Sequence, residues 1–150
     1  MNISIRQMRS LPDFFNDVDD PRRAQGRRHR LSTILGIAAG AVLCGMRSYE
    51  SIAEWADSLS QKARAHFRCR YHQGRYIVPS LSLIRNLLVR VDPAELEEAF
   101  RRWNEAYAQD DQSLAIDGKV MCNAIDESGR QTQIMSAVGH HTGICYAQKK

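Results

Sequence analysis

Residues 114–119 read Leu-Ala-Ile-Asp-Gly-Lys, an apolar run that carries one carboxylate, Asp117, immediately before a glycine. Two further runs with the composition of strands follow, at residues 131–139 and 144–148. The segments between the runs, 126–129 and 140–143, are short and rich in turn-forming residues, as in chains whose neighbouring strands are antiparallel. The pattern predicts a three-stranded antiparallel meander with an acid in its first strand.

The composition of the chain sets the class of protein. With 150 residues, 43% of them hydrophobic, the chain can bury a core and does not resemble a disordered tail. Its 21 Lys and Arg exceed its 17 Asp and Glu, which favours polyanionic partners. The four cysteines are scattered without a Cys-x-x-Cys pair, and the N-terminal residues lack the layout of a secretion signal. We therefore expect reduced thiols and a cytoplasmic location.

The longest apolar run extends from Leu31 to Met46 and contains Gly36 and Gly40 four residues apart. It is shorter than the roughly 20 residues that a bilayer crossing requires. We therefore predict a buried core helix and no membrane role, with the two glycines allowing a neighbouring helix to approach closely.

Hydrophobic periodicity and capping residues predict a mainly helical region before the strands. Ser48, Ser80 and Asp92 are the expected N-caps, and Glu95 is placed to return the capping bond of Asp92. Pro12 fits the first turn of a short helix. The predicted helices span residues 12–18, 31–46, 48–59, 80–90 and 92–107.

Basic residues are concentrated in two segments of the helical region. Residues 19–30 hold five arginines and little to bury, so we expect an exposed segment. Residues 61–91 hold seven Lys or Arg and no Asp or Glu, with Phe67, Tyr71 and Tyr76 interleaved. This mixture suits nucleic-acid contact, although a solvated basic face is the plain alternative. The candidate DNA-binding residues are Arg22, Arg23, Arg27, Arg28, Arg68, Arg70, Arg85, Arg90 and Lys119.

Two further patterns concern a helix-turn-helix and metal binding. The predicted helices 48–59 and 80–90 resemble a helix-turn-helix with an overlong connection. His66, Cys69 and His72 have the spacing of zinc ligands but lack a fourth, and the pair His140 and His141 falls in a predicted turn. For these histidines and the cysteine, ordinary surface and core roles are favoured over metal binding.

Four segments in this order resemble the DDE transposases of insertion sequences, of the H-repeat-associated kind. They are Leu11–Phe15, the Asp-Pro-Arg-Arg segment Asp20–His29, Ile52–Trp55 and Ala115–Lys119. The resemblance implies an α+β chain: a helical transposase-associated domain at residues 1–110, then the first strands of a ribonuclease H-like catalytic domain at residues 111–150, incomplete as a three-stranded antiparallel meander.

The resemblance also implies the chemistry. Asp117 matches the first acid of the DDE triad, a catalytic residue and metal ligand, whereas the second Asp and the Glu would lie beyond Lys150. Such enzymes hold Mg²⁺ or Mn²⁺ with three carboxylates for DNA strand cleavage and transfer. One carboxylate cannot hold two metal ions, so we expect this chain alone to be inactive and to bind no metal stably. After Lys119 the chain departs from the family's usual polar, basic continuation.

Two alternatives stay open at this point. One is a non-enzymatic DNA-binding or regulatory remnant of a transposase, acting through contacts with another copy or with a full-length transposase. The other is an unrelated helical interaction domain in which Asp117 accepts turn hydrogen bonds at a strand end.

Overall fold

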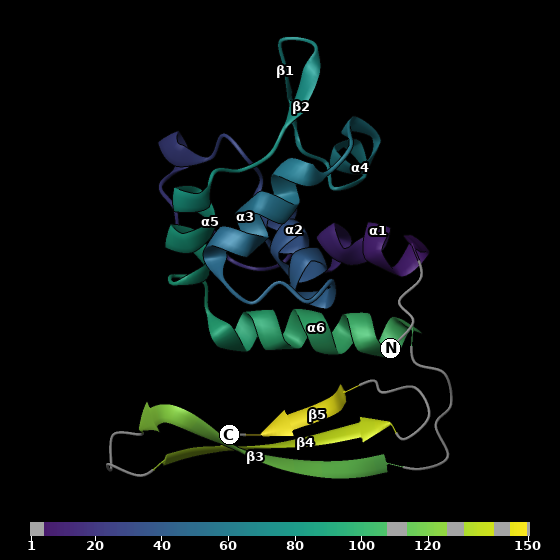
Figure 1. The fold of residues 1–150 in the computed structure, drawn as a ribbon, viewed down its shortest axis with the longest axis vertical. Helices are drawn as coiled ribbons and strands as arrows, with labels where there is room; N and C mark the ends of the chain where they lie inside the picture. The colour runs from purple at the N-terminus through teal and green to yellow at the C-terminus, as the bar shows by residue number, and fades with distance from the viewer. Residues whose placement is uncertain (1–4, 108–113, 126–130, 140–144, 150) are drawn as a thin grey trace. The chain divides into compact units, whose positions relative to one another are not determined.

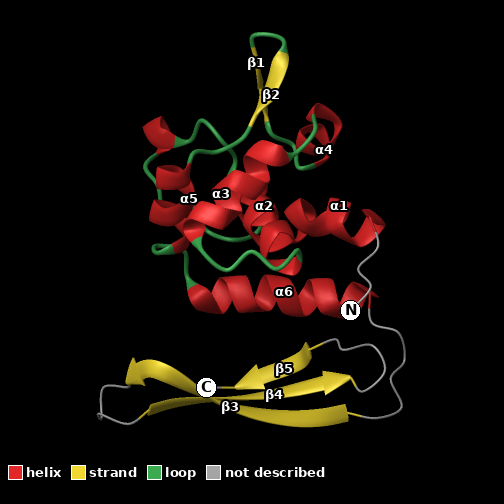
Figure 2. Cartoon of the chain, viewed as in Figure 1, coloured by secondary structure: helices red, strands yellow, loops and turns green. Residues whose placement is uncertain are grey.

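A computed structural model describes residues 5–107, 114–125, 131–139 and 145–149, with side-chain burial for most residues between 10 and 106. Helices occupy the first part of the chain and the longer strands the last part, so the chain is α+β (Figures 1 and 2). It divides into two compact units, one ending at Phe100 and the other beginning at Arg101. The predicted boundary near residue 110 lies outside the described residues.

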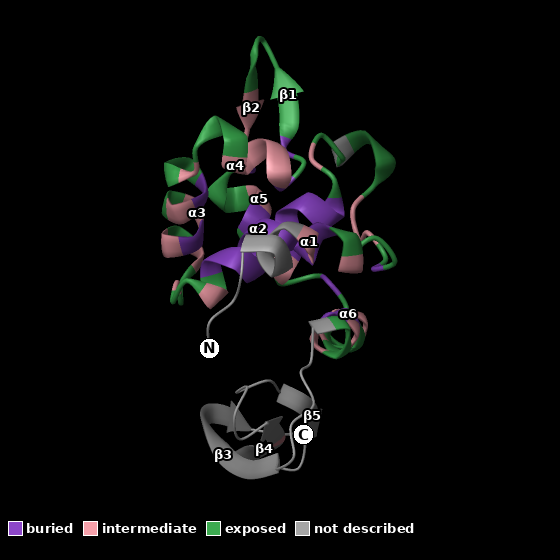
Figure 3. Ribbon diagram, turned by 90° about the vertical axis from the view of Figure 1, so that its right-hand side faces the viewer, coloured by how far each residue is buried: buried purple, intermediate pink, exposed green. Residues whose placement is uncertain are grey.

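The helical unit is built around α2, Leu31–Leu43, which contacts α1, α3 and α5. Every residue from Leu31 to Ala41 is buried (Figure 3), because this helix has no polar face and must be surrounded by other helices. None of the described helices is long and apolar enough to cross a bilayer. The helices of the chain are α1 Ile5–Phe14, α2 Leu31–Leu43, α3 Tyr49–Ser58, α4 Gln61–His66, α5 Leu81–Leu88 and α6 Pro93–Tyr107, with a 3₁₀ turn, η1, at Ala24–Gly26.

The two glycines of α2 allow close approach, which confirms their predicted role. A Cβ at Gly36 would lie 2.9 Å from Cγ of Pro12 in α1. A Cβ at Gly40 would lie 3.1 Å from Cη2 of Trp55 and 3.1 Å from Cζ of Phe67, which themselves meet edge to face. Small residues at these points let α1 and the aromatic pair pack directly on the backbone of α2.

The predicted N-terminal helix is wrong in its bounds and in the place of its proline. Instead of beginning at Pro12, α1 begins at Ile5, and Pro12 lies near its C-terminal end at Phe14. Burial decides this register, because Leu11, Pro12 and Phe15 are all turned into the core. The predicted second helix also ends earlier than Met46, because Gly45 adopts a φ of 90°, which interrupts a right-handed helix.

The predicted caps hold, with one correction. Ser48 accepts from Ser51 N–H, and the Ser51 hydroxyl accepts from Ser48 N–H; Ser80 caps α5 through Leu83 N–H. Asp92 accepts from Ala94 N–H at 2.8 Å. Glu95, however, does not return a bond to Asp92.

The Glu95 carboxylate accepts instead from the backbone N–H of Asp19, at 2.6 Å. This distant donor satisfies the carboxylate in place of the local capping bond. The bond joins the segment after α1 to the first turn of α6. Edge-to-face packing of Phe15 on Phe100, with ring centroids 5.3 Å apart, joins the same two regions.

A short hairpin within the basic region was missed from the sequence. Strand β1, Arg70–His72, pairs with β2, Arg75–Ile77, and the hairpin projects from the helical unit (Figure 1). Its turn residues Gln73 and Gly74 have φ of 48° and 80°, as the two-residue turns that match the twist of paired strands require. Gly74 indicates a turn in the sequence. Strands of three residues, however, are too short to show the alternation of side chains that identifies a β-strand.

The second unit contains the three expected strands, β3 Leu114–Ile125, β4 Gln131–Gly139 and β5 Cys145–Lys149. They pair antiparallel in the order β3-β4-β5, as predicted, with Asp117 opposite Ser136 and Lys119 opposite Ile134. Strand β3 continues to Ile125, past a register shift after Val120. The predicted turns, with His140 and His141, lie outside the described residues, as do the side chains of Asp117 and Lys119.

Candidate nucleic-acid interface

The eight arginines predicted to contact DNA divide into two groups in the structure. One group is engaged by acceptors within the protein: Arg22, Arg27, Arg68 and Arg90. The other group is exposed, and its side chains form no hydrogen bond or ion pair with another described residue: Arg23, Arg28, Arg70 and Arg85. The first group stabilises the fold, and the second group is able to bind a ligand.

Arg22 is the best-buried arginine of the first group, and it corrects the expectation that residues 19–30 are simply exposed. Its side chain is 8% exposed and bonds Asp20 through both Nε, at 2.9 Å, and Nη2, at 2.7 Å. Nη2 also donates to the carbonyl of His29. The bond from Arg22 lowers the pKa of the Asp20 carboxyl, and the nearby Arg27 acts in the same direction.

Arg27 closes the same loop from its other end. Its guanidinium donates to the carbonyls of Arg22, at 2.8 Å, and of Asp20, at 3.3 Å. Arginine forms such multiple bonds because its five N–H donors have a fixed geometry. Arg22 and Arg27 thus order the backbone that carries Arg23 and Arg28.

Arg68 and Arg90 connect segments far apart in sequence. Arg68 pairs with Asp13 of α1 at 2.6 Å, while its own carbonyl accepts from the Thr33 hydroxyl of α2. Its φ of 58° is the left-handed conformation that commonly ends a helix, here just after α4. Arg90 donates to the carbonyl of Pro21. Both side chains therefore support the fold.

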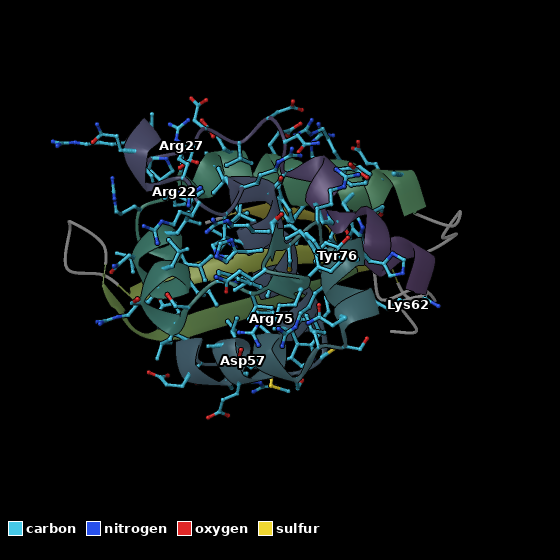
Figure 4. All side chains as sticks on the ribbon, turned by 90° about the horizontal axis from the view of Figure 1, so that it is seen from above. Arg22, Arg27, Asp57, Lys62, Arg75 and Tyr76 are labelled. Atoms are coloured by element: carbon cyan, nitrogen blue, oxygen red, sulfur yellow. The ribbon has the colours of Figure 1, made fainter. Side chains whose placement is uncertain are left out.

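Several basic side chains surround the hairpin (Figure 4). Looking onto the hairpin, Arg22 and Arg27 lie on one side, Lys62 lies on the other, and Arg75 lies between them. The side chains of Arg75 and Lys62 are exposed and have no partner among the described residues, although neither residue was among the predicted contacts. The acid-free composition of residues 61–91 was the signal that could have included them.

His29, in the loop at residues 19–30, has a basic environment. The ring is half-buried, and its Nδ1 has no hydrogen-bond partner within the described structure. Burial lowers the pKa of His29, and the charges of Arg70 and Arg22 lower it further. The charge of Arg70, at the base of β1, therefore acts on a residue of the loop at residues 19–30.

The hairpin is held by α4 through residues that sequence reasoning did not single out. The Gln61 amide bonds both backbone groups of Tyr76, accepting from its N–H at 2.7 Å and donating to its carbonyl at 3.2 Å. Arg64 donates to the same carbonyl and to those of Leu59 and Asp57. Arg64 is thus a structural arginine, although it lies in the basic segment.

The structure supports the helix-turn-helix hypothesis only in part. Helices α3 and α5 are in contact, and Arg85 and Asn86 are exposed on α5. However, α4 and the whole β1–β2 hairpin lie between them in sequence, so the connection is a structured insertion and not a turn. Helix α5 begins shortly after the end of β2.

No three His, Cys, Asp or Glu side chains gather as metal ligands in the described part of the chain. Of the zinc-like trio, Cys69 is buried, and burial raises its thiol pKa to about 11, which disfavours the thiolate that zinc binds. Among the residues of strands β3, β4 and β5, Asp117 is the only Asp or Glu. A single carboxylate does not fit a site for two divalent ions.

Comparison with known proteins identifies the family. Residues 12–104 match the model of the DDE_Tnp_1-associated family. A protein of Xanthobacter autotrophicus, "Uncharacterized protein in dhlA 3'region", is 32% identical over 91% of this chain and 46% of its own length. The "H repeat-associated putative transposase YhhI" of Escherichia coli K12 is 25% identical over 85% of this chain and 33% of its own length.

The "Putative transposase YncI" of Escherichia coli O157:H7 is 24% identical over 95% of this chain and 36% of its own length. The chain thus spans less than half the length of these three relatives. No solved structure matches it. The family model nevertheless matches more than half of the chain. The chain therefore belongs to the DDE transposase family through its DDE_Tnp_1-associated domain.

Proposed function

We propose that the helical unit is the DNA-binding part of a transposase and that Asp117 belongs to its catalytic domain. Family membership supports the proposal, since two of the similar proteins carry transposase in their names. The observation that carries it is a set of exposed arginines, from the loop, the hairpin and α5, whose side chains have no partner within the described structure. Free guanidinium groups bind phosphate through paired N–H donors without first breaking a protein contact.

The engaged arginines have a different part in this proposal. Arg22, Arg27, Arg68 and Arg90 hold the loop, the end of α4 and the segment after α5 in place. The DNA contacts are then assigned to Arg23, Arg28, Arg70 and Arg85. Contacts of this kind are made mainly to the DNA backbone, so we expect binding with little dependence on base sequence.

The catalytic part of the proposal rests on the family and on the strand order. A three-stranded antiparallel meander with an acid in its first strand supports a ribonuclease H-like domain, with Asp117 as the first of three carboxylates and Lys119 as a phosphate contact beside it. Mg²⁺ or Mn²⁺ is expected for the complete domain. The single acid of these strands does not hold two ions, so we assign DNA binding without cleavage to the 150-residue chain.

DNA affinity tests this function. Fluorescence anisotropy with a mixed-sequence duplex of about 20 bp, from about 50 to 200 mM salt, measures affinity and its salt dependence. Arg23→Gln, Arg28→Gln and Arg85→Gln should each weaken binding and reduce the magnitude of the log–log salt slope by about 0.9. Arg68→Gln is the matched control and should change the affinity less than about twofold.

If the free and the engaged arginines have equal effects, the assignment of contacts is wrong. If the wild-type chain does not bind the duplex at all, the proposed function is wrong. In a complete protein, Asp117→Asn should abolish strand cleavage and leave DNA affinity unchanged. Cleavage by that variant would remove Asp117 from the active site.

A regulatory role is the second candidate, and the exposed arginines favour it as well, because DNA binding through them needs none of the catalytic acids. A chain that binds DNA but does not cut it would compete with a full-length transposase for DNA or assemble with it. Added in excess, it should inhibit strand transfer by a full-length relative, and the Arg23→Gln/Arg85→Gln variant should inhibit less. No inhibition by the wild-type chain would contradict this role.

A further inference from the structure

The β1–β2 hairpin is the projection of the helical unit that no packing role explains. Every residue from Arg70 to Arg75 is exposed (Figure 3). Tyr71 retains 62% of its accessible surface. A two-stranded ribbon of three residues a side is marginally stable by itself. Its extension into solvent therefore requires support from the rest of the unit.

Helix α4 provides that support at the base of the second strand. The Tyr76 carbonyl accepts from both Gln61 Nε2 and Arg64 Nη1, and the Tyr76 N–H donates to Gln61 Oε1. The Arg64 guanidinium is itself fixed by two more carbonyls, those of Leu59 and Asp57. These bonds hold the base of the hairpin and leave its outer end uncovered.

The strand register gives the hairpin two different faces. Directly paired residues lie on the same face, so Tyr71 and Tyr76 share one face, where their rings meet edge to face at 5.0 Å. Arg70, His72 and Arg75 share the opposite face, because Arg70 and His72 alternate with Tyr71 and Arg75 pairs with His72. The aromatic pair stiffens the ribbon, and the other face presents two cations and an imidazole.

We propose that this hairpin enters a groove of duplex DNA with the face formed by Arg70, His72 and Arg75. The inference rests on the proposed function and names the element that penetrates the duplex. A two-stranded ribbon fits the major groove of B-form DNA, where its arginines reach the phosphates that border the groove. The acid-free segment around the hairpin and the neighbouring loop with Arg23 and Arg28 complement the flanking backbone.

The arrangement assigns separate roles to the residues of the surface. Arg70 and Arg75 contact DNA, whereas Gln61 and Arg64 are positioning residues that act through the backbone of Tyr76. Gly74 acts through conformation alone, because its φ of 80° suits a residue without a side chain and a Cβ there would meet nothing within 4 Å.

Anisotropy with the whole 150-residue chain and a mixed-sequence DNA duplex tests the proposal. Arg70→Gln and Arg75→Gln should each weaken binding and reduce the magnitude of the salt slope by about 0.9, as the loss of one phosphate contact requires. Arg47→Gln removes an exposed arginine outside the hairpin and is the charge-matched control, expected to leave the slope unchanged. Thermal unfolding of each variant verifies that the fold is intact.

Gly74→Val provides a variant that keeps all charges. A β-branched residue disfavours the positive φ of the turn, so we expect weaker DNA binding with the helical core unaffected. An RNA duplex of the same sequence tests groove entry, because the A-form major groove is too narrow and deep for side chains to read. Binding to RNA should be weaker and insensitive to Arg75→Gln.

The possible results distinguish this proposal from the proposed function. If the hairpin variants bind DNA like the wild type while Arg23→Gln and Arg85→Gln weaken binding, the hairpin inference is wrong and the DNA-binding function stands. If the wild-type chain binds no duplex, both are wrong. Equal affinity for the RNA and DNA duplexes, with equal loss in Arg75→Gln, would overturn groove entry.

Discussion

Gln61 and Tyr76 exchange two hydrogen bonds across 15 residues of sequence, the Gln61 amide acting as both donor and acceptor for the Tyr76 backbone. A side chain placed this way substitutes for a neighbouring strand, because it satisfies an N–H and a C=O on one edge of β2. The two bonds thereby fix the hairpin to α4.

Gln61→Met keeps the size of the side chain and removes both bonds. We expect a loss of about 1 kcal/mol in the free energy of unfolding, since the region is exposed and water replaces part of the interaction. The Tyr76 amide should exchange its hydrogen faster with solvent, measured by NMR. Gln25→Met, at an exposed glutamine of η1 without a described partner, is the control, and faster Tyr76 exchange in that variant would contradict the assignment.

Gly36→Ala should destabilise the helical unit. Alanine favours a helix over glycine by up to about 1 kcal/mol, but its Cβ would lie 2.9 Å from the rigid ring of Pro12. Overpacking of this kind costs about 1–3 kcal/mol, so the net change should be unfavourable. Urea unfolding measures it.

Gly40→Ala is the informative comparison for that variant. Its Cβ would lie 3.1 Å from the Trp55 and Phe67 rings, which can shift by a few tenths of an ångström. We expect the gain in helix propensity to offset more of the cost, and Gly40→Ala to be more stable than Gly36→Ala. The reverse order would contradict the close packing of Pro12 on α2.

The stability of the helical unit should fall in mild acid because of His29. Its pKa in the folded chain is below the ordinary value of 6.5, owing first to burial and then to Arg70 and Arg22. The unfolded chain therefore binds more protons in this range, so stability is fully present above pH 6.5 and is lost as the pH falls through the folded pKa. Chemical unfolding from neutral to mildly acidic pH measures the loss.

His29→Gln, which cannot become charged, should flatten this pH dependence. His72→Gln, which removes an imidazole from the exposed hairpin, is the control and should leave the wild-type slope in place. If both variants retain the full slope, another group is responsible for it.

Because Glu95 accepts from the Asp19 N–H, we expect substitutions of Glu95 to lower the free energy of unfolding by graded amounts. Glu95→Gln keeps an oxygen acceptor but loses its charge, so a loss of about 1 kcal/mol is expected. Glu95→Ala leaves the Asp19 N–H to water, because the bond is exposed, and should cost somewhat more, about 1.5 kcal/mol. Glu97→Gln, at an exposed position of the same helix, controls for the change in net charge, and equal losses at Glu95 and Glu97 would argue for a general charge effect.

Much of the local structure followed from the sequence. The N-caps at Ser48 and Ser80 and the buried helix from Leu31 were all predicted, as was the order of the three strands around Asp117. Each depends on residues within a few positions of one another or on a continuous apolar pattern, so the information is contained in one segment.

The errors have a common cause in contacts between distant segments. Glu95 has a partner 76 residues away in sequence, and Pro12 is placed by its contact with Gly36. The β1–β2 hairpin depends on Gln61 and on a two-residue turn, because its strands are too short to show alternation. Local patterns could not reveal these partners.

The sequence by itself determined that the chain is α+β, basic and similar to DDE transposases, because composition, periodicity and motif order are properties of the linear chain. Only the tertiary structure decided which arginines are free. Arg68 is engaged because α1 brings Asp13 to it, and Arg90 because Pro21 presents a carbonyl. An arginine binds whichever acceptor the fold places within its reach, and that proximity exists only after the helices have packed.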